Sequence, residues 1–480
     1  MRGVMPITLC GRKIKVLNKQ TPPIPAPSLE QKIYELSFIW KEAEYNFAFW
    51  EHINARLPAN DKNDPNPSLS PASRWWDAEY RKALKAVIAT ETLYDYFREI
   101  KKFLALLRDG HTQAYQPNEI YTSEYYSNLP VKIEYHCGQW VISNIKRSYS
   151  GTIKLWDIVS KFNGMPIQEY IEQNVFPYIW HEKLDSANWQ VNLELTSGAE
   201  GSVVTLEIDG EVHTLERTFG DKNWLVGNKL TAPEAVKKEY DSETHTIEIT
   251  SDNIAIITID DFGYDNLPDE IYANYSLLEK AKGFIIDIRN NGGGNSSNGD
   301  AVAALFFKKT FSGGHYKLPA HIGYYKANAP YLYDDGQQWV KDALNVGKRS
   351  FYHLDEPIVR CVKNYDPPGL LRQPVVLLTT AETGSAAEDF AISMLPRGTI
   401  VGTPTTGSTG QPIFYTLDSG VTFRICTQYC KLPCGGEYIN HGVQPHIHFE
   451  PSLDERKTGI DTHLAKGLEV LRNANYQKSL

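Results

Sequence analysis

The stretch that most constrains this chain is a buried strand that turns sharply into a helix at a serine. Residues 375–378 are four apolar β-formers, and a small polar turn after them ends at Gly384 and Ser385. Residues 386–395 then have a composition and spacing typical of a helix. A serine at such a junction lies beside free backbone N–H groups and the positive end of the helix dipole. It can therefore be an N-cap or an acyl-transfer nucleophile. The stretch alone favours the cap, because helix starts far outnumber nucleophiles.

Composition excludes several classes of protein. The 480 residues are enough for roughly two to four domains. Hydrophobic residues make up 41% of the chain and charged residues 22%, as is typical of a globular protein. A net charge of −9 without a basic block argues against a nucleic-acid surface. No apolar run approaches the ~20 residues of a membrane-spanning helix, and the apolar piece near the N-terminus is too short for a signal-peptide core.

Three of the six cysteines lie close together in the sequence, at Cys426, Cys430 and Cys434. Their spacing lacks the second matching pair that makes a strong zinc signal. We therefore expect free thiols or one local disulfide here. The sequence predicts neither a metal nor a cofactor.

The first part of the chain is helical. Apolar residues recur at helical spacing over residues 28–47, where Ser28 begins a pattern like a capping box. A second helical region is predicted over residues 76–107, and Gly110 is a natural helix stop. His111 therefore lies in a turn just beyond a long helical region.

The rest of the chain changes character twice. Residues 129–215 show the two-residue period and turn signals of β-hairpins, which predict a small β-rich module. Residues 232–241 are enriched in Lys and Glu and are predicted to be a linker. From residue 244 onward strands alternate with helices, which indicates an α/β core. The tyrosine-rich insertion at 316–365 is interpreted as a lid or substrate wall.

Three consecutive glycines, Gly292–Gly294, follow the buried strand at 283–288. Glycines allow a substrate backbone to come close and can present N–H groups to an anion. The segment lacks the Lys-Ser/Thr of a phosphate loop and the spacing of a dinucleotide site. It fits an oxyanion hole better, and Ser385 is the candidate nucleophile for it.

Several motifs in a fixed order resemble the tail-specific (C-terminal-processing) protease family of serine peptidases, and are most similar to its tricorn-core-like bacterial branch. The motifs in the second half are Asp-Ile-Arg-Asn-Asn-Gly-Gly-Gly at 287–294, Gly-Ser-Ala-Ala-Glu at 384–388, Gly-Thr-Pro-Thr at 402–405 and Gly-Val-Gln-Pro at 442–445. Further similar segments lie at 40–49, 106–112, 156–159 and 163–167.

The resemblance, which spans about residues 30–470, implies the fold and its division. It implies an α/β protein whose catalytic core has the crotonase/Clp-protease-like spiral fold. The expected domains are an N-terminal helical domain over 28–125, a PDZ-like β-rich domain over 126–225 and an αβ serine peptidase core over 236–476.

The resemblance also assigns roles to individual residues. Ser385 matches the nucleophile and His111 the general base. Glu437 matches the carboxylate that orients the imidazole, although Glu388 and Asp109 stay open as alternatives. These matches imply a Ser–His–Glu set that performs acyl transfer.

Two positions depart from the family's other catalytic arrangements. Ser408 stands where the Ser–Lys branch has its lysine, which disfavours a dyad. Gly110 stands where the tricorn relay has a serine, which favours a plain triad. The oxyanion hole is assigned to the backbone N–H groups of Gly293 or Gly294 and Ala386.

The resulting prediction is a serine endopeptidase that acts on peptides or unfolded proteins. The resemblance implies a periplasmic or extracellular location, although no signal peptide is visible in the sequence. One alternative is a catalytically impaired peptide-binding homologue with the same fold. The other is a crotonase-like acyl-CoA enzyme, which needs no serine nucleophile.

Overall fold

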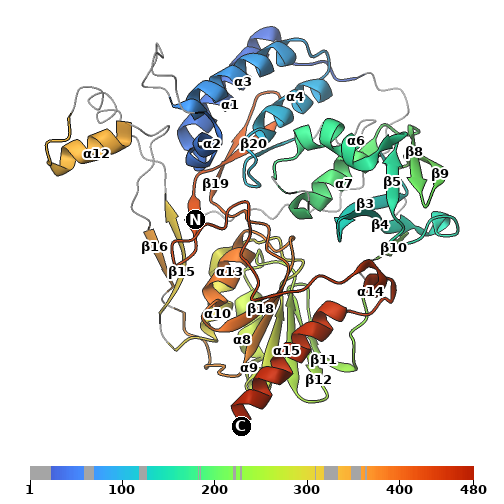
Figure 1. The fold of residues 1–480 in the computed structure, drawn as a ribbon, viewed down its shortest axis with the longest axis vertical. Helices are drawn as coiled ribbons and strands as arrows, with labels where there is room; N and C mark the ends of the chain where they lie inside the picture. The colour runs from blue at the N-terminus through green and yellow to red at the C-terminus, as the bar shows by residue number, and fades with distance from the viewer. Residues whose placement is uncertain are drawn as a thin grey trace.

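The computed structural model describes residues 23–58, 70–117, 120, 127–181, 183, 185–219, 223–227, 230–308, 310–317, 333–347, 358–362 and 365–479. Much of the insertion at 316–365 lies outside the described residues, so its interpretation as a lid stays a prediction. The described part folds around a seven-stranded sheet of order β11-β12-β13-β14-β17-β18-β22 (Figure 1). Its strands are β11 (Val236–Asp241), β12 (His245–Thr250), β13 (Ile254–Ile259), β14 (Gly283–Asp287), β17 (Val375–Thr379), β18 (Gly398–Gly402) and β22 (Ile447–His448).

The middle of this sheet is parallel and apolar. From β13 to β22 each neighbouring pair is parallel, whereas β11, β12 and β13 pair antiparallel. Every residue of β14 and β17 is buried. Parallel strands covered on both faces show such continuous apolar runs. The carboxyl ends of β14 and β17 lead directly into the glycine triplet and the Ser385 turn.

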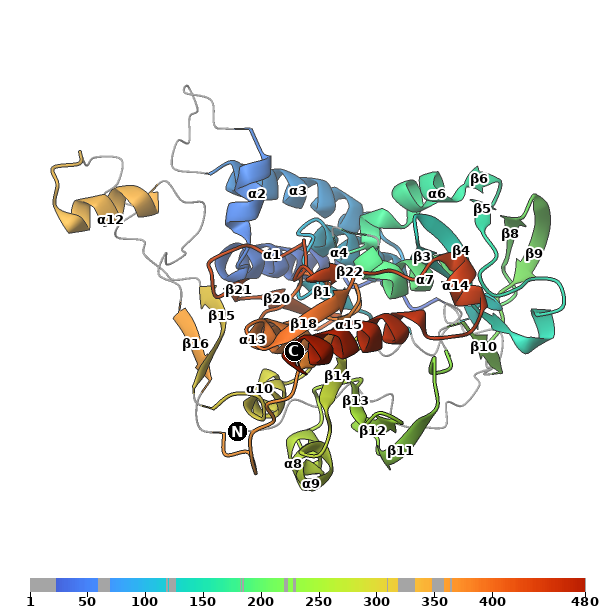
Figure 2. The same ribbon diagram turned by 60° about the horizontal axis from the view of Figure 1, so that its bottom comes forward.

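Helices cover both faces of the sheet. One face packs on α15 (Thr462–Ser479) through Leu464, Leu468 and Leu471. The other face carries α8 (Leu267–Ala273), α9 (Tyr275–Leu278), α10 (Ser296–Ala304) and α13 (Ala386–Met394) (Figure 2). This arrangement confirms the prediction of an α/β core.

The N-terminal helices pack onto that second face and extend its core. They are α1 (Leu29–Asn46), α2 (Trp50–Arg56), α3 (Pro71–Ile88) and α4 (Leu93–Ala105). One hydrophobic cluster runs from Trp76 in α3 to Phe390 in α13. The region predicted as continuous over 76–107 is two helices, because Thr92 begins the second one by accepting a hydrogen bond from the Asp95 N–H. Gly110 does not end this helix as predicted, because α4 stops at Ala105 with Leu106 as its cap residue.

A small sheet of order β1-β20-β19 joins the helical region to the core. Its strands are β1 (Gln113–Tyr115), β19 (Pro412–Thr416) and β20 (Thr422–Cys426). Another small sheet, of order β16-β15-β21, contains β15 (Phe311–Lys317), β16 (Ile358–Val362) and β21 (Tyr429–Lys431). α12 (Gln338–Gly347) lies apart from this sheet in both ribbon views.

The β-rich module has a hydrophobic cluster of its own, drawn from residues 129–215. One sheet contains β3 (Val131–His136), β4 (Gln139–Lys146) and β10 (Trp224–Val226), and the other contains β5 (Val159–Phe162), β6 (Met165–Pro166), β8 (Val203–Ile208) and β9 (Glu211–Glu216). Helices α6 (Ile167–Asn174) and α7 (Asn188–Thr196) and the short pair β2 (Ser127–Asn128) and β7 (Ser197–Gly198) complete it. The PDZ-like character and the exact domain boundaries stay predictions.

The segment predicted as a linker, 232–241, instead contains strand β11, which pairs with β12 at the edge of the central sheet. Its lysines and glutamates face solvent. Charged side chains on an edge strand discourage pairing with other chains. The composition that suggested a linker therefore belongs to a protected edge.

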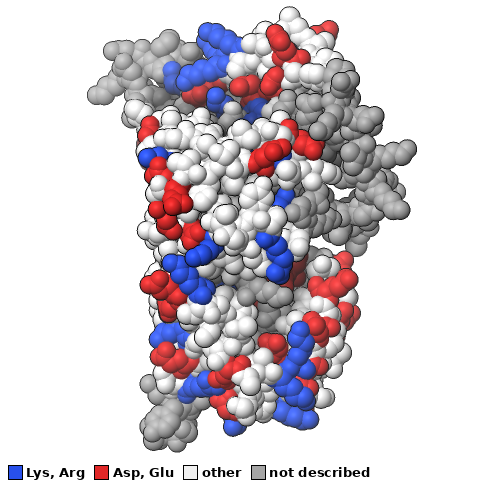
Figure 3. All heavy atoms as spheres, turned by 90° about the vertical axis from the view of Figure 1, so that its right-hand side faces the viewer, with Lys and Arg blue, Asp and Glu red and all other residues white. Residues whose placement is uncertain are grey.

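The surface carries mixed charge. On the face drawn in Figure 3, acidic and basic side chains alternate without a large patch of either sign. Among the described residues, no helix is both long and apolar enough to cross a bilayer.

Candidate active site

Ser385 occupies the N-cap position of α13 but does not have the backbone geometry of an ordinary helix cap. It precedes α13 with φ +53° and ψ −122°, and its side chain makes no capping hydrogen bond. Positive φ is costly for a residue with a Cβ. The contribution of Ser385 to the helix is its backbone carbonyl, which accepts a hydrogen bond from the Glu388 N–H at 2.9 Å. The capping role considered for Ser385 is therefore not its role in this structure, because the strained backbone turns the hydroxyl away from the helix.

His111 is held in its turn by polar contacts with strand β20. The Cys426 N–H donates to the Thr112 hydroxyl at 3.0 Å, and that hydroxyl donates to the Asp109 carboxylate at 2.6 Å. Arg424 donates to the Gly110 carbonyl at 2.8 Å. The turn after α4 is thus fixed from both sides, and the imidazole is buried with only 8% of its surface exposed.

The structure brings His111 and Ser385 together from elements 274 residues apart. His111 Nε2 lies 3.0 Å from Ser385 Oγ, which is hydrogen-bond distance. A serine hydroxyl paired with an imidazole is the arrangement of an activated nucleophile.

The second ring nitrogen of His111 meets a residue without a predicted role. His111 Nδ1 lies 2.9 Å from Ser408 Oγ. Ser408 lies in the loop between β18 and β19 and is 5% exposed. Its backbone carbonyl also accepts the Ser385 N–H at 3.0 Å. The sequence had marked this position only as lacking a lysine.

Glu388 supports this loop from helix α13. Its fully buried carboxylate accepts hydrogen bonds from the Gly407 N–H at 2.7 Å, the Ser408 N–H at 2.9 Å and the Thr405 hydroxyl. Burial raises the pKa of Glu388 to about 7, against the three donors, which lower it. Glu388 therefore acts on Ser408 and makes no direct contact with the imidazole.

The structure does not bring Glu437 to His111. Its carboxylate bonds to the Tyr429 hydroxyl and, at 2.8 Å, to Lys431 Nζ, with 42% of its side chain exposed. Both ring nitrogens of His111 are already engaged by other residues. The prediction that Glu437 orients the imidazole is thus corrected. The alternative Asp109 holds Thr112 in the same turn.

The glycine triplet lies directly against the Ser385 turn. A Cβ at Gly293 would lie 2.5 Å from Ser385 Cβ and 3.0 Å from the Ala386 nitrogen, so only glycine fits there. The Gly293 N–H donates to Asn291 Oδ1 at 2.9 Å. Gly293 was predicted as an oxyanion donor, but its N–H is bonded within the loop. The missing Cβ of Gly293 lets this loop lie against Ser385.

Gly294 and Ala386 present their N–H groups differently. Phe262 and Gly294 form an isolated parallel β-bridge. The Phe262 N–H donates to the Gly293 carbonyl, and the Phe262 carbonyl accepts from the Asn295 N–H. In this pattern the Gly294 N–H faces away from Phe262. Ala386 is the first residue of α13, so its N–H has no acceptor within the helix.

The electrostatic environment keeps the imidazole neutral. Burial holds the pKa of His111 well below its usual range, and the positive charge of Arg424 acts in the same direction. A neutral imidazole can accept a proton at neutral pH.

No group of three or more metal-ligating side chains occurs among the described residues. Cys426, Cys430 and Cys434 are free thiols, the first two buried and the third exposed.

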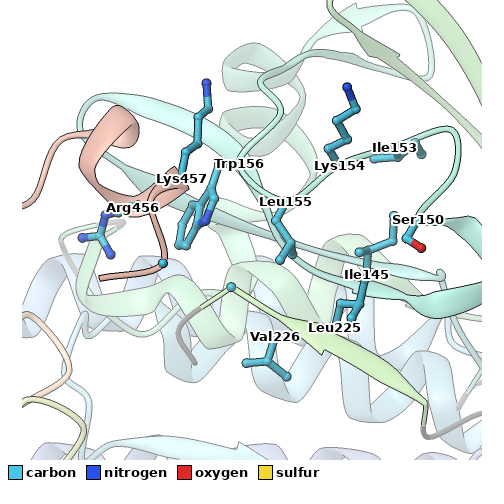
Figure 4. Close-up of a pocket in the computed structure, with 12 residues that line it drawn as sticks. Ile145, Ser150, Ile153, Lys154, Leu155, Trp156, Leu225, Val226, Arg456 and Lys457 are labelled. Carbon is cyan, nitrogen blue, oxygen red and sulfur yellow. The ribbon is translucent and has the colours of Figure 1, made fainter. Parts of the chain in front are cut away.

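A pocket of about 390 Å³ lies away from Ser385, between the β-rich module and α14 (Leu453–Lys457) (Figure 4). Leu155, Trp156 and Leu225 form an apolar wall, and Lys154, Arg456 and Lys457 lie at its rim. None of the predicted site residues lines it. The candidate active site is therefore identified by its hydrogen-bond geometry and not by a cavity.

Comparisons with known proteins agree with this fold. Residues 253–449 match the model of peptidase family S41. A structure of mature CPAF complexed with lactacystin superposes with a TM-score of 0.65 at 16% identity, covering 93% of this chain and 98% of that one. A crystal structure of mature CPAF gives 0.64 at 14% identity, with the same coverage. No curated protein matches the chain by sequence.

Proposed function

We propose that this chain, a serine-type peptidase of family S41 by its residues 253–449, cleaves internal peptide bonds through an acyl-enzyme on Ser385. The observation that carries this proposal is the 3.0 Å contact between Ser385 Oγ and His111 Nε2. The strained backbone that releases Ser385 from capping supports the same reading. Strain at a single residue is often a mark of a functional site.

The first step is attack on the substrate carbonyl. Ser385 Oγ bonds to the carbonyl carbon while its proton passes to His111 Nε2. The same nitrogen then protonates the leaving amine as the peptide C–N bond breaks. In the second half of the cycle water attacks the acyl carbon while its proton passes to His111 Nε2. That proton returns to Ser385 Oγ as the ester bond breaks and the acid product leaves.

The tetrahedral oxyanion is assigned to the N–H groups of Gly294 and Ala386. Gly294 follows Gly293, which lies against Ser385, and Ala386 begins α13 directly after Ser385. A donor of this kind typically contributes about 3 kcal/mol to lowering the barrier. Of the two glycines left open by the sequence, Gly294 is favoured because the Gly293 N–H already bonds to Asn291.

The substrate class is a peptide or an unfolded protein. The β-rich module over residues 126–225 fits a PDZ-like domain that holds an extended chain by adding it to a sheet edge. The helical domain over 28–125 then supplies His111, and the core over 236–476 supplies Ser385. Export from the cytoplasm is the location that accords with this role.

A peptide-library digest read by mass spectrometry tests the proposal. The wild-type protein is expected to cut peptides at internal bonds, and Ser385→Ala is expected to cut none above background. Binding of peptides without cleavage by either protein would support an impaired peptide-binding homologue. Turnover of acyl-CoA thioesters that survives Ser385→Ala would support a crotonase-like enzyme.

A further inference from the structure

Among the described residues, the two ring nitrogens of His111 have one hydrogen-bond partner each, and both partners are hydroxyl groups. We propose that Ser408 is the residue that positions His111, in the place that a carboxylate holds in a Ser–His–Asp or Ser–His–Glu set. This inference rests on the proposed function, in which His111 is the general base. The evidence is the 2.9 Å contact between Ser408 Oγ and His111 Nδ1, both of which are buried.

The position of Ser408 depends on the residue before His111. A Cβ at Gly110 would lie 2.6 Å from Ser408 Oγ and 2.4 Å from His181 Cε1. A side chain at position 110 and a hydroxyl in the present place therefore exclude each other. The absence of a Cβ at Gly110 opens the space that Ser408 fills.

Ser408 is itself fixed by a buried carboxylate. Its N–H donates to Glu388 Oε2 at 2.9 Å, and the Gly407 N–H donates to Glu388 Oε1 at 2.7 Å. The Ser408 carbonyl accepts the Ser385 N–H at 3.0 Å. One residue thus contacts the nucleophile through its backbone and the base through its side chain. A shift of this loop would change the Ser385–His111 distance.

A serine hydroxyl can donate or accept a hydrogen bond, so Ser408 is compatible with the tautomer that the reaction needs. His111 Nε2 must carry a lone pair to take the Ser385 proton, so Nδ1 must carry hydrogen. Ser408 Oγ accepts that Nδ1–H throughout the cycle, while the protons taken from Ser385 and later from water pass through Nε2 alone. A hydroxyl is neutral, so it orients the imidazole without the charge stabilisation that a carboxylate gives to imidazolium.

Three substitutions at one position test the inference. Ser408→Ala removes the acceptor, and kcat is expected to fall by roughly 10²-fold with KM nearly unchanged, since tautomer control contributes to general-base catalysis. Ser408→Thr keeps the hydroxyl and is expected to stay within about threefold of wild type, because the same acceptor remains. Ser408→Cys keeps the volume but has a weak acceptor, so a loss between these two is expected.

The matched control is Thr409→Val, which removes the neighbouring buried hydroxyl at nearly constant shape and is expected to leave kcat unchanged. If Ser408→Ala does not fold, the Thr and Cys variants decide the question. The inference would be overturned by equal kcat in all folded Ser408 variants, or by a rise in KM without a fall in kcat. Activity that persists in Ser385→Ala would instead overturn the proposed function, so the two failures are distinguishable.

Discussion

Two neighbouring units of the core share one architecture and differ in how the helix begins. In each, a fully buried parallel strand, β14 or β17, leads through a short turn into a helix, α10 or α13. At α10 the cap residue Asn295 has φ −96° and its side chain accepts the Ser297 N–H at 3.0 Å. At α13 the cap position is Ser385, with φ +53° and no such bond. The start of α13 therefore has no side-chain cap, and the Ser385 hydroxyl contacts His111 instead.

The comparison teaches that the same local pattern can hold a capping side chain in one unit and leave the hydroxyl free to meet a histidine in the other. It predicts opposite effects of removing the two polar side chains.

The largest effect is expected for Ser385→Ala. Loss of the nucleophile is expected to lower kcat/KM by at least about 10⁴-fold. The free energy of unfolding is expected to stay within about 0.5 kcal/mol of wild type, because no cap bond is lost. Peptide hydrolysis and urea unfolding measure the two quantities. A loss of stability comparable to that of a missing cap would show that Ser385 does cap α13.

The glycine loop gives the next largest effect. Gly293→Ala places a Cβ 2.5 Å from Ser385 Cβ at φ +116°, so we expect a loss of about 1–3 kcal/mol in unfolding free energy together with most of the activity. Gly292→Ala is the matched control, because its Cβ would meet no atom within 4 Å. If the two variants behave alike in unfolding and peptidase assays, the close contact between Gly293 and Ser385 does not require a glycine.

The pH dependence tests the state of the imidazole. Protonated His111 cannot accept the Ser385 proton, and burial holds the pKa of His111 well below its usual range. The acid limb of kcat/KM is therefore expected to have its midpoint below the ordinary histidine value of about 6.5, with activity kept as the pH falls through that value. A profile of kcat/KM from acidic to alkaline pH measures this. A midpoint above about 6.5 would contradict the neutral buried base.

A smaller effect is expected for Asn295→Ala. Removing this cap is expected to cost about 1 kcal/mol of unfolding free energy. Urea unfolding beside Ser385→Ala completes the comparison of the two helix starts. An unchanged midpoint would mean that the Asn295 bond to Ser297 contributes nothing.

The smallest effect is expected for Glu437→Gln. Its carboxylate contacts Tyr429 and Lys431 and not His111, so kcat is expected to change by less than about threefold, as for a surface substitution. Steady-state kinetics decide between the structure and the sequence-based triad. A fall of roughly 10²-fold or more would restore Glu437 as the orienting carboxylate.

The parts of the site that the sequence predicts are those with a strong local pattern. The strand, turn and helix around Ser385 follow from apolar runs and small residues, and the turn of His111 follows from the end of the helical period near residue 107. The prediction of a linker at 232–241 was wrong, because an edge strand with charged side chains has the composition of a linker.

Ser408 could not be found in this way. It lies 297 residues from His111, and its place depends on the missing Cβ of Gly110. Only the folded chain brings the two together. The same reason explains Glu437, whose motif fits but whose side chain points to Tyr429.

The most direct measurement of the central claim is labelling with a fluorophosphonate probe, followed by intact mass and peptide mapping. One adduct on Ser385 is expected in the wild type, none in Ser385→Ala, and labelling slowed by about 10²-fold or more in His111→Ala. Labelling that persists in Ser385→Ala, or an adduct on another serine, would contradict the claim that Ser385 is the nucleophile activated by His111.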